Sequence, residues 1–117
     1  MPGRSAERRG RAAERLAAAL LRLKGFSVLD RRFATPWGEI DIVARRGDLL
    51  VFVEVKRRPD RAAALEALSE RQRARIARAA ELFLRRRPAL AHLRCRFDVV
   101  AVGGWGWPVH VTNAWRP

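Results

Sequence analysis

Two apolar segments separated by a short polar turn constrain the fold of this chain most. Residues 39–44 alternate acidic and apolar side chains, and residues 49–56 are apolar up to Glu54. The intervening Arg45-Arg46-Gly47-Asp48 has the composition of a hairpin turn. Because strands of this kind must bury their apolar faces, we expect the pair to form the centre of a β-sheet.

Amphipathic segments flank this pair of strands. Residues 11–24 carry apolar side chains at helical spacing and end at Gly25, and residues 64–87 predict a long helix that stops before Pro88. Three more strands are expected, over residues 26–33, 94–102 and 107–113, the last two joined by a turn at Gly103-Gly104. The order αβββαββ predicts one α/β domain over residues 1–117, with a mixed central sheet and a helix on each face.

Basic residues outnumber acidic ones by 25 to 12, which gives a formal net charge of +13. Such a charge favours polyanionic partners, and nucleic acid before an anionic membrane. The longest apolar run, residues 16–21, is far shorter than the roughly 20 residues of a membrane helix, and the N-terminal region lacks the apolar segment of a signal peptide. The single cysteine, Cys95, allows no internal disulfide. We therefore expect a cytoplasmic protein without membrane association.

Acidic residues gather on the two paired strands. Side chains alternate between the faces of a strand, so Glu39 and Asp41 are expected to point to the same side. If Ala44 pairs with Leu49 across the turn, Glu39 faces Glu54 and Asp41 lies on its diagonal. Carboxylates this close destabilise a sheet unless a cation or a base compensates their charge.

This residue set suits metal-assisted hydrolysis of phosphodiesters. Mg²⁺ binds one or two carboxylates together with water and phosphate oxygens, so Asp41 and Glu54 are candidate ligands of Mg²⁺ or Mn²⁺. Lys56, one of only two lysines in the chain, shares a strand face with Glu54. It can orient or deprotonate water, or contact the phosphate. A surface ion pair between Glu54 and Lys56 is the alternative.

Two helical residues extend the set. Glu14 lies at the edge of the first apolar stripe, where it can point inward past the sheet. Gln72 lies in the middle of the apolar stripe of the long helix, where an unpaired amide costs about 1–3 kcal/mol. A position beside the acidic strands satisfies this amide. The alternative is an exposed Glu14 and a Gln72 bonded to backbone at the sheet edge.

The chain resembles the YraN-like bacterial proteins, which are similar to the archaeal Holliday-junction resolvases of the PD-(D/E)-x-K nuclease superfamily. The matching segments are Gly10 with Glu14–Ala17, Gly38–Ala44, Phe52–Lys56, Arg96–Val100 and Asn113-Ala114. The resemblance implies a restriction-endonuclease-like core. It assigns Glu14, Asp41, Glu54 and Lys56 to the catalytic quartet, with Gln72 near the helical glutamine. One departure is Arg32, which stands where the family usually has Asn.

Further residues are candidates for contact with nucleic acid. The arginines lie at the ends of the two acidic strands, where they can hold phosphates: Arg45, Arg46, Arg57 and Arg58. Trp37, just before the first acidic strand, can stack on an unpaired base.

We therefore expect a Mg²⁺- or Mn²⁺-dependent endonuclease that hydrolyses DNA phosphodiester bonds, with branched or structured DNA as a candidate substrate and no small-molecule cofactor. Cleavage of a junction needs two symmetric nicks, which implies a homodimer. Two alternatives stay open. One is a basic nucleic-acid-binding module on a nuclease fold without turnover, and the other is a nuclease directed at RNA.

Overall fold

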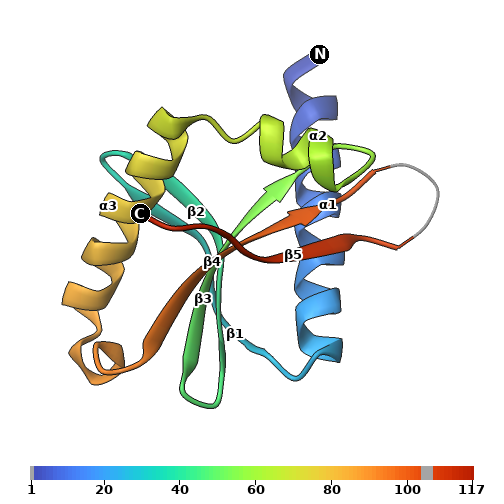
Figure 1. Ribbon diagram of the computed structural model, residues 1–117. Helices are drawn as coiled ribbons and strands as arrows, with labels where there is room; N and C mark the ends of the chain where they lie inside the picture. The colour runs from blue at the N-terminus through green and yellow to red at the C-terminus, as the bar shows by residue number, and fades with distance from the viewer. Residues whose placement is uncertain (1, 104–106) are drawn as a thin grey trace.

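Five strands form one sheet in the order β1-β2-β3-β4-β5 (Figure 1). The computed structural model describes residues 2–103 and 107–117, with side chains from residue 10 onward, so Gly104 of the expected turn lies outside the described residues. The strands are β1 Ser27–Thr35, β2 Gly38–Arg46, β3 Leu49–Lys56, β4 Arg94–Ala101 and β5 Val109–Trp115. Neighbouring strands are antiparallel except β3 and β4, which are parallel. The predicted mixed sheet is confirmed.

Helices cover both faces of the sheet. Figure 1 shows α1 (Pro2–Leu23) and α3 (Glu70–Arg86) on opposite sides of it. The core under α1 contains Ala17, Ala18, Leu21, Ile42, Val51 and Val53. The core under α3 contains Ile40, Val43, Phe52, Ile76, Ala80 and Phe83. Since β3 contributes to both cores, the helices on the two faces confirm the predicted α/β arrangement.

The turn between β2 and β3 is shorter than predicted. Gly47 (φ +61°) and Asp48 form the whole turn, and Arg46 pairs with Leu49. The predicted pairing of Ala44 with Leu49 is wrong by two residues, because a two-residue hairpin closes tightly where glycine accepts a positive φ. A register shift of two residues does not by itself move a side chain to the other face, but it changes which residues lie opposite one another.

The long helix predicted over residues 64–87 is also wrong, because the chain forms two helices there. α2 spans Arg61–Glu66, and α3 starts after Ser69, whose hydroxyl accepts a hydrogen bond from the Gln72 backbone N–H at 3.1 Å. Asp60 caps α2 through the Ala63 N–H at 2.9 Å. These two side-chain caps provide helix starts that the continuous apolar spacing concealed.

The ends of other elements also differ from the predictions. α1 starts at Pro2 rather than residue 11, and β5 spans Val109–Trp115 rather than residues 107–113. A short 3-10 helix, η1 (Pro88–Leu90), leads from α3 to β4. Hydrogen bonding and local packing decide such ends, and apolar spacing does not resolve them.

In both β1 and β2, the alternation of side chains between the two faces of the sheet is interrupted at paired positions. Ile40 packs in the core under α3 and Ile42 in the core under α1, although side chains two residues apart in a regular strand share a face. On β1 the partners of these residues are Phe33 and Arg31, and between them Arg32 has φ +56°. A positive φ is costly for a side chain other than glycine or asparagine. The irregularity therefore spans both strands beside Asp41.

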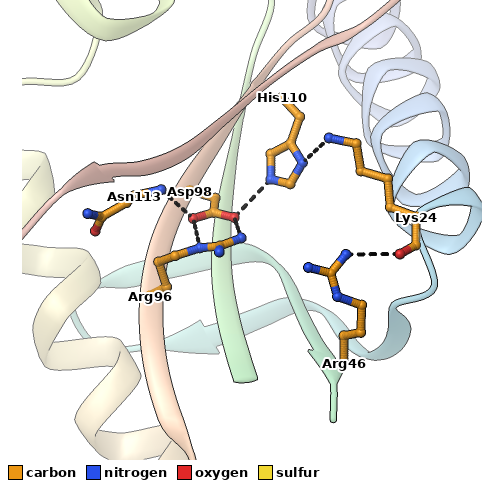
Figure 2. A network of polar contacts seen from close by, with 6 residues as sticks. All are labelled: Lys24, Arg46, Arg96, Asp98, His110 and Asn113. Carbon is orange, nitrogen blue, oxygen red and sulfur yellow. Dashed lines mark hydrogen bonds and ion pairs between the residues drawn. The ribbon is translucent and has the colours of Figure 1, made fainter. Parts of the chain in front are cut away.

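A buried carboxylate ties β4 to β5 and to the end of α1 (Figure 2). Asp98, 1% exposed, accepts hydrogen bonds of 2.8 Å from Arg96 Nε and Nη2, 2.8 Å from His110 Nε2 and 2.9 Å from the Asn113 N–H. Lys24 Nζ donates to His110 Nδ1 at 2.8 Å. Burial by itself raises the pKa of Asp98, but these hydrogen bonds outweigh it and lower that pKa.

We predict that Asp98→Asn lowers the free energy of unfolding by about 3 kcal/mol, because it leaves Arg96 and the buried His110 without their anion. The matched control is Asp48→Asn, since Asp48 forms an exposed pair with Arg94 at 3.2 Å and its loss should change stability little. Urea unfolding of the two variants measures the difference. Equal effects of the two substitutions would contradict a structural role for the Asp98 network.

Candidate functional site

Asp41 lies where β2 and β3 stop pairing. Their ladder ends at Ile42 opposite Val53, so the next position in the same register places Asp41 opposite Glu54. Asp41 Oδ2 accepts a hydrogen bond of 2.7 Å from the Val55 N–H, and a side chain thus replaces the expected backbone partner. The prediction that Glu39 faces Glu54 is wrong, because the short turn shifts the register by two residues. Asp41 lies opposite Glu54 instead.

Lys56 and Gln72 lie beside Glu54 on the α3 side of the sheet. Lys56 Nζ is 3.7 Å from Glu54 Oε1 and donates a hydrogen bond of 3.1 Å to Gln72 Oε1. Gln72 Nε2 donates to Glu54 Oε1 at 3.4 Å. The Gln72 amide therefore holds both charged groups, and the partners that its predicted burial required are these two side chains.

The two carboxyl groups perturb each other. Burial raises the pKa of Glu54 to about 9, and the charge of Asp41 is the next largest cause, while Lys56 opposes both. Burial also raises the pKa of Asp41, and the Val55 N–H opposes that increase. A buried carboxyl beside a half-buried one, with one ammonium nearby, retains a proton near neutral pH unless a cation replaces it.

Glu14 reaches this region from α1 but has arginine partners. Its Oε2 accepts a hydrogen bond of 2.7 Å from Arg32 Nε and lies 4.0 Å from Arg31 Nη2. The Glu14 side chain is only 12% exposed. Its charge still acts on Asp41, whose pKa it helps to raise after the larger effect of burial. The structure thus brings Asp41, Glu54, Lys56 and Gln72 into contact and leaves Glu14 adjacent, paired with Arg32.

A small cavity opens beside Glu54. Its volume is about 110 Å³, and among its lining residues are Trp37, Glu39, Glu54, Gln72 and Arg75. Trp37 is 37% exposed. No sequence pattern distinguishes Arg75 from the other arginines of α3, and only the position of this helix brings it to the cavity.

The four candidate arginines lie at two different ends of β2 and β3. Arg45 Nε donates to Gly47 O at 2.9 Å, and Arg46 donates to Lys24 O at 3.0 Å, both beside the hairpin turn. Four residues of strand, about 13 Å, separate Arg45 from Asp41. Arg57 and Arg58 directly follow Lys56 and are exposed. They are the two that lie at the carboxylate end.

The donor set at Asp41 and Glu54 fits a hard divalent cation. Within residues 10–103 and 107–117, His, Cys, Asp and Glu side chains form no group of three or more that could enclose a metal ion. Mg²⁺ does not need such a group, because it is commonly held by one or two carboxylates and completes its shell with water and phosphate oxygens. Two adjacent carboxyls that retain a proton for want of positive charge match that requirement.

Comparison with known proteins identifies the family. The model of "Uncharacterised protein family UPF0102" matches residues 13–102, which include Glu14, Asp41, Glu54, Lys56 and Gln72. The chain belongs to this family. It is 53% identical to the UPF0102 protein of Mesorhizobium japonicum over 109 residues, covering 93% of this chain and 87% of that one. For the UPF0102 protein of Maricaulis maris the identity is 53% over 114 residues, with 97% and 90% covered.

Among the described residues, none of the helices combines the length and the apolar character needed to cross a bilayer. α1, the longest helix, has 22 residues and carries exposed arginines at Arg11, Arg15 and Arg22.

We predict that Glu54→Gln changes how stability depends on pH in metal-free buffer. The raised pKa means that the folded state of the wild type holds a proton that the unfolded state releases above its ordinary value of 4.5, so stability falls as pH rises from there toward about 9. Glutamine removes this proton, and the melting temperature of the variant should fall less between pH 6 and pH 9. Thermal melts across that range provide the measurement.

The matched control is Glu39→Gln, which makes the same change at an exposed carboxylate beside the same cavity. It should keep the pH dependence of the wild type. If Glu54→Gln keeps it as well, the Asp41–Glu54 pair is not the source of the dependence.

Proposed function

We propose that this UPF0102 protein is a metal-dependent endonuclease that hydrolyses DNA phosphodiester bonds. The observation that carries the proposal is the contact of Asp41, Glu54, Lys56 and Gln72 at one end of the β2–β3 pair, in a chain of net charge +13. A protein that only binds a polyanion gains nothing from buried carboxylates facing it. A nuclease that binds a divalent cation through them does.

Each residue has a role that its surroundings support. A bound Mg²⁺ or Mn²⁺ would activate water and neutralise charge on the phosphate. Asp41 and Glu54 would hold the ion and give up their retained proton. Lys56, 3.7 Å from Glu54 Oε1, can orient the water or donate to a phosphate oxygen. Gln72 is a positioning residue, because its amide fixes Lys56 and Glu54 relative to each other.

The resemblance to the YraN-like proteins and the PD-(D/E)-x-K nucleases supports the same proposal. It predicted four catalytic residues from sequence motifs, and three of them lie at the end of the β2–β3 pair: Asp41, Glu54 and Lys56. The mixed sheet with a helix on each face is compatible with a restriction-endonuclease-like core. Branched DNA is the substrate we propose, and its symmetric cleavage requires a homodimer.

One observation favours the alternative of a nucleic-acid-binding module without turnover. Glu14, the fourth residue of the quartet, is bonded to Arg32 at 2.7 Å and not to Asp41 or Glu54. If Glu14 is needed for catalysis, this ion pair must open. A cleavage assay separates the two functions.

We predict that the protein cleaves labelled four-way junctions in Mg²⁺ or Mn²⁺, and that Glu54→Ala and Lys56→Ala each lower the rate by about 100-fold or more. Flaps, duplex, single-stranded DNA and RNA serve as competing substrates. Lys24→Ala is the matched control for Lys56, since it removes the other lysine at the end of α1, and it should cleave normally. Binding without cleavage by the wild type would support the non-catalytic module.

We also predict that Mn²⁺ raises the melting temperature of the wild type, more at pH 8 than at pH 6, because the ion replaces a retained proton. At a Mn²⁺ concentration 100 times the dissociation constant, the gain in stability is about 2.7 kcal/mol. Asp41→Asn should lose most of this gain, and Glu39→Gln should keep it. An unchanged gain in Asp41→Asn would place the ion elsewhere.

A further inference from the structure

Four guanidinium groups gather between α1 and β1, away from the arginines selected from the sequence. Arg11 and Arg15 come from one face of α1, and Arg31 and Arg32 come from β1. Together they line a cavity of about 320 Å³. We call these four residues the arginine cluster.

The charge of the arginine cluster is only partly compensated. Within the described part of the chain, Glu14 is the one carboxylate at ion-pair distance from any of the four, 2.7 Å from Arg32 and 4.0 Å from Arg31. Within residues 10–103 and 107–117, four guanidinium groups thus have one carboxylate at ion-pair distance, while Glu39 and Asp41 act on Arg32 from farther away. The buried Nε of Arg31 also has no hydrogen-bond partner. A ligand that carries negative charge and accepts several hydrogen bonds would compensate the charge of the exposed guanidinium groups.

The backbone of β1 is shaped to build this cluster. Successive side chains of a regular strand point to opposite faces, yet Arg31 and Arg32 both approach Glu14 on α1. The φ of +56° at Arg32 breaks the alternation and allows both guanidinium groups to lie on the same side. Such a backbone conformation is unfavourable for a residue other than glycine, and strain of this kind concentrates at functional sites.

The cavity of the arginine cluster is linked to the cavity beside Glu54 by residues that line more than one cavity. Arg11 and Arg32 also line a second cavity, of about 330 Å³, together with Gly10, Glu14 and Glu39. Glu39 in turn lines the small cavity that contains Glu54 and Gln72. Shared lining residues therefore link the three cavities, from the four arginines to Glu54 and Gln72.

We propose that the arginine cluster binds the backbone phosphates of the same nucleic-acid strand whose scissile phosphate lies at Asp41 and Glu54. Guanidinium groups bind phosphate oxygens with paired, charge-assisted hydrogen bonds. The inference rests on the proposed function for the scissile end, but the binding itself does not depend on cleavage. It assigns strand contact to a face of α1 and β1 rather than to Arg45 and Arg46 at the hairpin turn.

The experiment measures binding in EDTA, where cleavage cannot contribute. Fluorescence anisotropy with labelled junction, duplex and single-stranded DNA compares the wild type with the double variant Arg11→Gln/Arg15→Gln. Loss of two phosphate contacts should weaken binding by about tenfold or more near 0.1 M salt. It should also reduce the magnitude of the slope of log K against log[salt] by about 2. These residues are exposed on α1, and thermal melts confirm that the variant folds.

The matched control is Arg78→Gln/Arg85→Gln, which removes the same charge from exposed positions of α3 on the other side of the sheet. It should weaken binding far less. Equal weakening by both double variants would overturn the proposal, because net charge alone would then explain it. Weaker binding of inorganic phosphate by Arg11→Gln/Arg15→Gln, with its affinity for DNA unchanged, would also overturn it.

The outcome also separates this inference from the proposed function. A specific loss of DNA binding in Arg11→Gln/Arg15→Gln together with no cleavage by the wild type would support the arginine cluster and contradict the nuclease. Normal DNA binding by that variant together with Glu54-dependent cleavage would support the nuclease and contradict the arginine cluster.

Discussion

The rest of the fold depends on the burial of β3 on both faces. Leu49, Val51 and Val53 pack under α1, and Leu50 and Phe52 pack under α3, so neither helix is dispensable. β2 and β4 satisfy its backbone on both edges. Polar groups are admitted only where this apolar cover stops, at the last residues of the strand. The location of the candidate site is therefore a consequence of how the central strand is buried.

The two acidic centres have opposite electrostatics, and this difference indicates which of them is structural. Asp98 is surrounded by Arg96, His110 and a backbone N–H, and its pKa is lowered. Asp41 and Glu54 lie together with Lys56 as their nearby cation, and their pKa values are raised. The first carboxylate is satisfied by the fold itself. The second pair is not, and an arrangement that the protein leaves short of positive charge is where an external cation is expected.

The sequence predicted the elements that follow from periodicity and the residues that follow from motifs. The apolar run over residues 49–53 identified β3, and the position of Gln72 in an apolar stripe correctly required polar partners. The predictions that failed depended on local interactions at single residues. The Ser69 cap divided the long helix, and Gly47 shortened the hairpin turn by two residues. Both signals are single residues that compete with a pattern extending over many.

The partners of Glu14 were beyond prediction for a different reason. They depend on a positive φ at Arg32, a residue that rarely adopts it, at a level where β1 and β2 change faces together. Arg32 stands where the YraN-like proteins usually have asparagine, and asparagine tolerates a positive φ better than arginine does. Composition gave no basis for distinguishing the arginine cluster, because it contains four of 25 basic residues and only the packing of α1 on β1 brings them together.

The two-residue turn between β2 and β3 has a consequence for the order of folding. Asp41, Glu54 and Lys56 lie on consecutive strands, so contacts that are close in sequence bring them together early. Gln72 can join them only after α2 and α3 have crossed the sheet to allow the parallel pairing of β3 with β4. Closing that crossover is the slower, non-local step. The two carboxylates are therefore expected to meet before the amide that fixes Glu54 and Lys56, and a cation bound between them would act on the rate of folding as well as on the folded protein.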